Sequence, residues 1–126
     1  MNNGKRGMLS QQRTREILEG HLSRNAPTWE LLIKNGVAEG SPLPLHFFFY
    51  TKKKDQAIAL KRQLEQETNF DVHTESQGWL RKQWAILGST QAAPVSLKTI
   101  NDWCRYMTAT GAMFDCEFDG WEAQIS

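Results

Sequence analysis

Short strand-like runs alternate with longer helical segments between Leu45 and Trp121, and this order constrains the fold more than any other feature of the sequence. The strand-like runs are either wholly apolar or alternate between apolar and polar residues. They span Leu45–Thr51, Phe70–Thr74, Trp84–Gly88 and Phe114–Trp121. Apolar residues at helical spacing predict one helix at Lys54–Glu67 and a second that opens at Pro94 and Ser96 and stops at Gly111. The predicted order is therefore β-α-β-β-α-β.

This order predicts an α+β fold of the ferredoxin-like type, in which a four-stranded antiparallel sheet carries both helices on one face. In that topology Leu45–Thr51 and Trp84–Gly88 form the central pair of strands. Phe114–Trp121 then lies at an edge of the sheet, beside Leu45–Thr51. We expect this sandwich to occupy residues 41–126.

Residues 1–40 are predicted to form an N-terminal helical arm. Met1–Gly7 is polar and contains glycine, so we expect it to be disordered. A first short helix follows at Gln11–Leu22, and Ser23–Ala26 breaks its pattern. Pro27 suits the first position of a second short helix, which Asn35 and Gly36 end. Glu39–Pro44 is then the clearest linker of the chain.

The composition excludes several classes of protein. The 126 residues fit one domain, and 15 Lys+Arg against 14 Asp+Glu leave no bulk charge to attract nucleic acid or a membrane. No apolar run has the length of a membrane span, and Met1–Ser10 lacks the apolar stretch of a secretory signal. Two cysteines, Cys104 and Cys116, are too few for a disulfide scaffold or a cysteine-based zinc site. We expect a cytoplasmic protein with no cofactor, no metal and no membrane contact.

The sequence contains no familiar catalytic motif. The histidines His21, His46 and His73 fall on different elements and share no metal-ligand spacing. One hypothesis is that His46 acts as a base beside Asp115 or Glu117. We prefer a structural role, in which His46 only fills a position in the pleated strand, because no nucleophile is apparent. We therefore expect a protein that is not an enzyme.

One face of the predicted sheet carries aromatic side chains. If Leu45, Phe47 and Phe49 face the helices, then His46, Phe48 and Tyr50 face the opposite side. Aromatic side chains on such an open face can stack nucleic-acid bases. We prefer a different interpretation, in which the N-terminal arm or a second copy of the chain covers this face, because an adjacent row of carboxylates would repel phosphate.

A run of three lysines, Lys52, Lys53 and Lys54, stands where the first predicted helix of the sandwich begins. It is a candidate anion contact. The alternative, a solvated turn, is preferred because no glycine-rich loop accompanies the cluster.

Carboxylates alternate along the last predicted strand and are followed by a tryptophan. Asp115, Glu117 and Asp119 point one way, and Trp121 lies beside them. Such a row is typical of a solvated edge, but tryptophan with charged neighbours is also common at interfaces. Both interpretations stay open. If this row is an interface, we expect its partner to be a protein.

The same segment reads FDCEFDGW and resembles the signature of the regulator of ribonuclease E activity B family, in which the last strand reads close to FDVEYDGW. The two differ at Cys116 and Phe118. Weaker similarity covers most of the chain in order. The resemblance implies a ferredoxin-like, non-catalytic bacterial protein whose family positions, as candidate partner contacts, are Asp115, Glu117, Asp119, Gly120 and Trp121.

The characterised member of that family binds ribonuclease E and restrains its cleavage of RNA. We therefore expect a small regulator of RNA metabolism with ribonuclease E as its partner. Members with the inhibitory role are strongly acidic, whereas this chain is near neutral, so a different protein partner is one alternative. A module that binds single-stranded nucleic acid through His46, Phe48 and Tyr50, together with Lys52–Lys54, is the other. The oligomeric state stays open.

Overall fold

The computed structural model describes residues 8–78 and 82–124 and shows an α+β fold, as predicted. The expectation of disorder at Met1–Gly7 lies outside the described residues. The elements, in chain order, are α1 Gln11–Lys34, β1 Pro42–Leu43, β2 Leu45–Thr51, α2 Lys54–Glu67, β3 Asp71–Ser76, β4 Trp84–Ser89, β5 Ala93–Pro94, α3 Leu97–Ala112 and β6 Glu117–Ala123.

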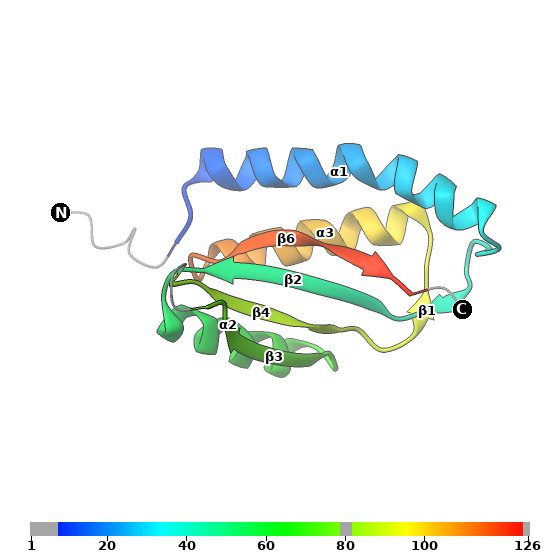
Figure 1. Ribbon diagram of the computed structural model, residues 1–126. Helices are drawn as coiled ribbons and strands as arrows, with labels where there is room; N and C mark the ends of the chain where they lie inside the picture. The colour runs from blue at the N-terminus through cyan, green and yellow to red at the C-terminus, as the bar shows by residue number, and fades with distance from the viewer. Residues whose placement is uncertain (1–7, 79–81, 125–126) are drawn as a thin grey trace.

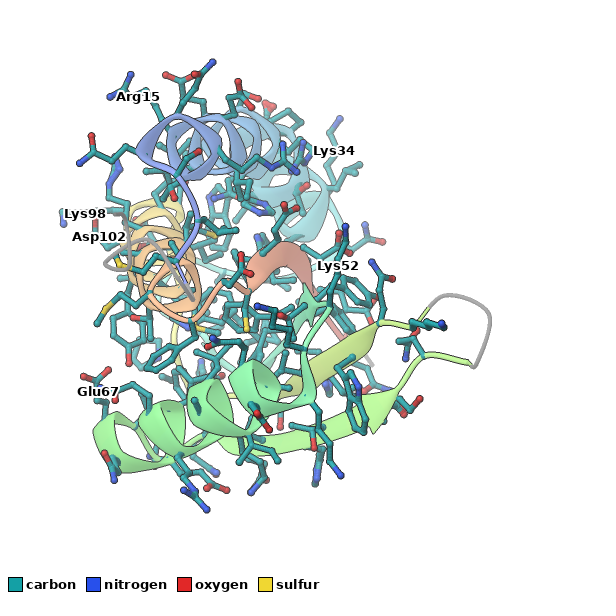
Figure 2. The ribbon with its side chains drawn as sticks, turned by 90° about the vertical axis from the view of Figure 1, so that its left-hand side faces the viewer. Arg15, Lys34, Lys52, Glu67, Lys98 and Asp102 are labelled. Carbon is teal, nitrogen blue, oxygen red and sulfur yellow. The ribbon has the colours of Figure 1, made fainter. Side chains whose placement is uncertain are left out.

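The main sheet has four antiparallel strands in the order β3-β4-β2-β6. The predicted central pair, β2 and β4, is confirmed, and β6 lies at the edge beside β2. Helix α2 packs against β2, β3 and β4, and α3 packs against β6. Both helices lie behind the sheet in Figure 1 and to its left in Figure 2, so no helix of residues 8–78 and 82–124 covers the other face of the sheet.

The core lies between this sheet and the helices α2 and α3. Alternate residues of β2 point into it, and Phe47 and Phe49 are fully buried. The helices contribute apolar side chains at the spacing expected from the sequence, including Leu60 and Leu64 from α2 and Met107 from α3. This packing fixes which face of β2 remains free.

A second, two-stranded sheet pairs β1 with β5, so the expectation of a single sheet and of a linker at Glu39–Pro44 is wrong in part. Pro42 faces Pro94 and Leu43 faces Ala93. Two prolines cannot donate to the ladder, so this ribbon stays two residues long. Val95 lengthens the connection, because its carbonyl accepts from the Gly40 amide at 2.7 Å and its amide donates to the Ser41 carbonyl at 3.1 Å.

The N-terminal arm is one continuous helix, α1, rather than the two short helices that were predicted. Pro27 lies inside it and cannot donate to the Ser23 carbonyl, which is normally enough to end a helix. Asn25, which is 2% exposed, holds the helix across this point through hydrogen bonds to Asn101 of α3 and Trp121 of β6. Tertiary contacts therefore override the local break.

Helix α1 packs beside α3 and along the outer edge of β6 (Figure 1). At the middle of this seam the His21 imidazole donates to the Phe118 carbonyl, with Nε2 and O 2.7 Å apart. At its start, the Leu9 amide donates to the carbonyl of Ala112. Of the two predicted covers of the aromatic face, the N-terminal arm is therefore wrong, because α1 packs along the edge of β6 instead. Cover by a second copy of the chain stays a prediction.

The last strand begins three residues later than predicted. The chain turns after α3 so that the amides of Phe114 and Cys116 both donate to the Gly111 carbonyl. Gly111 does not stop the helix but lies within it, where a Cβ atom would be 2.7 Å from Cε2 of Phe49. Its role is close packing of α3 on the sheet.

Candidate protein-binding surface

The face of the main sheet that carries no helix is built from alternate residues of its four strands. The register places side chains in three rows across β3, β4, β2 and β6, and we call these residues together the open face. The rows are Asp71, Ser89, His46 and Glu122; then His73, Leu87, Phe48 and Gly120; then Glu75, Ala85, Tyr50 and Glu117.

The predicted alternation along β2 is confirmed. Leu45, Phe47 and Phe49 are buried, whereas His46, Phe48 and Tyr50 are half-buried on the open face. A large aromatic side chain on a surface without a covering helix loses only part of its contact with water. The centre of the open face is therefore apolar and partly accessible at Leu87, Phe48 and Tyr50, whereas Ala85 is buried.

Carboxylates occupy the outer positions of this face. Asp71 and Glu75 come from the edge strand β3, and Glu122 and Glu117 come from the opposite edge strand β6. Asp71, Glu75 and Glu122 are exposed, and the structure gives them no ion pair with another described residue. The open face thus has an apolar centre between two acidic borders.

The carboxylates of the C-terminal motif do not form the single row that was predicted. Asp115 precedes β6, in the turn, with a φ of 58°. The register of β2 and β6 shifts between Phe48 and Phe49, so that Asp119 is the extra residue of a β-bulge. Only Glu117 lies on the open face, because the bulge directs Asp119 toward α1, where it lines a polar pocket with His21 and Arg24.

Gly120 and Trp121 have structural contacts on the side of α1. Gly120 follows the bulge with a φ of 146°, a conformation that residues with a side chain rarely adopt. Trp121 packs against the core cluster, and its Nε1 donates to Oδ1 of Asn25 at 2.9 Å. The structure therefore gives this tryptophan a partner within the chain.

Glu117 links β6 to α1. Both of its oxygens accept from the Arg13 guanidinium, at 2.7 and 3.0 Å. These hydrogen bonds lower the pKa of Glu117 below its usual value, so it is ionised at neutral pH. One corner of the open face is therefore partly neutralised by α1.

His21 is a structural histidine. It is 4% exposed, and because the Phe118 carbonyl can only accept, Nε2 carries the proton. Arg24 lies 3.2 Å from Nδ1 and donates to it. Burial lowers the pKa of His21, and the charge of Arg24 lowers it further. These two effects outweigh the hydrogen bond to Phe118, which raises the pKa.

The three lysines lie at the end of β2 and the start of α2. All three are exposed, and Lys53 is the N-cap residue of α2 without a side-chain capping bond. The Lys54 ammonium lies 5.4 Å from the centre of the Trp84 ring, within the range of a cation–π contact. Lys52 lines a pocket of about 310 Å³ with Tyr50, Asp115 and Glu117, so two acidic residues share the pocket with this lysine.

The remaining titratable groups do not converge. Cys104 and Cys116 are fully buried, and burial raises the pKa of both thiols, that of Cys116 to about 12. His46 and His73 lie on separate strands of the open face. Within residues 8–78 and 82–124, no three histidine, cysteine or acidic side chains are grouped as metal ligands would be. In the same part of the chain, no helix has the length and apolarity to cross a bilayer.

Sequence reasoning missed the contribution of β3 and β4 to the open face. Asp71, His73 and Glu75 alternate with Val72 and Thr74, and this polar-apolar alternation was a sufficient signal for a half-exposed strand. Leu87 was hidden in an apolar run that is typical of a strand buried on both sides. What no pattern revealed is that these residues lie in register with Phe48 and Tyr50.

Comparison with known proteins agrees with the motif of the last strand. Residues 23–123 match the family model described as Regulator of ribonuclease activity B. The match runs from the second half of α1 to the end of β6, and so includes the whole main sheet. No curated protein matches the chain. The match covers far more than half of the residues, and the chain therefore belongs to the Regulator of ribonuclease activity B family.

Proposed function

We propose that this chain is a non-catalytic cytoplasmic regulator that binds a ribonuclease of the E type and restrains its cleavage of RNA. The observation that carries the proposal is the family match over residues 23–123. The separation of the described histidines and the burial of both thiols support a role without chemistry of its own. The strand order supports the ferredoxin-like assignment, to which the β1–β5 ribbon is an addition.

Restraint by binding needs an accessible surface, and the open face provides one. Its half-buried aromatic side chains, Phe48 and Tyr50, are typical of positions that become buried in a complex. Restraint would then be steric or allosteric. The motif residues Gly120 and Trp121 support this surface from behind, by fixing the course of β6.

The test uses the purified chain and purified ribonuclease E. We expect association in the micromolar range or tighter and slower cleavage of a labelled RNA when the chain is present. The control is the chain with RNA alone, which should leave the RNA intact. Absence of association at micromolar concentrations refutes ribonuclease E as the partner, and cleavage by the chain alone refutes a non-catalytic role.

A different protein partner is the second candidate, and the charge of the chain favours it. A net charge of +1 gives no long-range attraction to a strongly basic region of a nuclease. Capture of a different protein, with ribonuclease E absent from the bound fraction, is the result that this candidate predicts.

A further inference from the structure

We propose that the open face is the docking surface of the chain and that it binds a single basic protein segment, with Arg or Lys residues on both sides of an apolar anchor. This inference rests on the proposed function in one respect, that the chain acts by binding a protein. It adds the surface, the chemistry of the occupant and its geometry.

The spacing of the carboxylates determines where the basic residues must lie. Asp71 and Glu122 are at opposite ends of one row, three strand spacings apart, which is about 14 Å. At physiological salt, charges beyond about 8 Å are largely screened from one another. One basic group therefore cannot serve both borders, and the segment needs at least two.

The centre of the face determines the anchor. Leu87 and Phe48 are adjacent in the middle row, and Ala85 and Tyr50 are adjacent in the next. An apolar side chain placed here loses contact with water together with two partly exposed aromatic rings. A guanidinium group from the segment can also stack on Tyr50 or Phe48, which favours Arg over Lys.

The size of the face favours a segment over a folded domain. Four strands and about five residues along each give a plan area of about 300 Å². A stable interface between folded proteins buries about 800 Å² on each partner. A second copy of the chain in face-to-face contact would also bring Asp71, Glu75 and Glu122 against the same carboxylates, which repel.

The lysines determine at which end of the open face the basic residues of the segment lie. Lys52 and Lys53 follow Tyr50 at one end of the face, whereas Asp71 and Glu122 flank His46 at the other. The basic residues of the segment are therefore expected at the His46 end. RNA is disfavoured as the occupant, because its phosphates would meet the carboxylates of the two borders.

The test uses the full chain and a labelled peptide of two Arg-Ala-Leu-Ala-Arg repeats, with the arginines replaced by glutamate in the control peptide. We expect micromolar binding of the basic peptide at about 50 mM salt by fluorescence anisotropy, and loss of it in high salt. Amide shifts in NMR should map onto β2, β4 and the edges beside them. Failure of the basic peptide to bind, or shifts confined to the helices, overturns the proposal.

Two variants locate the site. The triple variant Asp71→Asn, Glu75→Gln, Glu122→Gln removes the borders with isosteric side chains and should weaken binding about tenfold. The matched control, Glu19→Gln, Glu30→Gln, Glu39→Gln, changes the net charge equally at exposed positions elsewhere and should leave binding unchanged. Leu87→Lys should abolish it, with far-UV circular dichroism verifying the fold.

Equal binding by the border triple variant and the unmodified chain refutes the surface. So does displacement of the peptide by a short single-stranded RNA that binds more tightly to the same residues, which would make the face a nucleic-acid site. Binding and cleavage assays with ribonuclease E distinguish the proposed surface from the proposed function. If the triple variant restrains it as well as the unmodified chain does, the surface fails and the function stands. If the peptide binds but ribonuclease E does not, the surface stands and the partner fails.

Discussion

Trp121, the last residue of the family motif, is held by Asn25, and we predict that the two residues are energetically coupled. The indole Nε1 donates to Oδ1 of Asn25 at 2.9 Å, and Nδ2 of Asn25 donates to Asn101 at 2.8 Å. The perturbation is Asn25→Leu, which keeps the branched shape and the number of heavy atoms of the side chain and removes both hydrogen bonds. It leaves the indole N–H of Trp121 without its partner.

The magnitude follows from these contacts. A buried donor left unpaired costs about 1–3 kcal/mol, and the second lost hydrogen bond costs about 1 kcal/mol. Leucine recovers part of this, since it avoids burying an amide at a position that is 2% exposed. We expect Asn25→Leu to lower the free energy of unfolding by about 2–3 kcal/mol. In a double-mutant cycle with Trp121→Phe, the coupling should be about 1–2 kcal/mol.

The assay is urea denaturation followed by far-UV circular dichroism, because fluorescence changes when a tryptophan is removed. All four proteins of the cycle are compared at neutral pH. A coupling below about 0.3 kcal/mol would refute the proposed energetic coupling of Asn25 and Trp121. The ribonuclease assay then separates fold from contact: if Trp121→Phe is folded but no longer restrains the nuclease, the tryptophan has a role beyond its hydrogen bond to Asn25.

Three further predictions concern other contacts. His21 is buried and neutral, so the unfolded chain binds more protons and stability should fall as the pH drops below about 6.5; His21→Gln should flatten this slope in urea midpoints compared between about pH 7.5 and about pH 5. Gly111→Ala should destabilise the fold despite a helix-propensity gain of about 1 kcal/mol, because overpacking against Phe49 costs about 1–3 kcal/mol; an unchanged melting temperature contradicts this. Glu117→Gln should lower the urea midpoint slightly at low salt and not at high salt, since the Arg13 pair is half exposed.

Local patterns predicted the elements of the main sheet well. The bounds of Leu45–Thr51 and Lys54–Glu67 are confirmed to the residue, because a wholly apolar run and a clear helical stripe leave few alternatives. The continuity of α1 could not be predicted. Pro27 is a local signal for a break, and the hydrogen bonds that overcome it come from Asn101 and Trp121, which are remote in sequence.

The candidate site was predicted in part. Alternation along one strand was enough to place Phe48 and Tyr50 on the face without helices. The β-bulge at Asp119 was invisible, because it depends on how β6 meets β2 and reverses the direction of every later side chain. Glu122 therefore joins the open face, and Asp119 leaves it.

The position of α1 limits how copies of this chain can join through their sheets. Helix α1 covers the outer edge of β6, where His21 donates to the Phe118 carbonyl, so among the described strands of this sheet β3 has the remaining free border. When two copies pair along β3, the free border of each copy becomes hydrogen-bonded to that of the other. Growth by strand addition to this sheet would thus end at a pair, and an open-ended fibre has no second strand from which to continue.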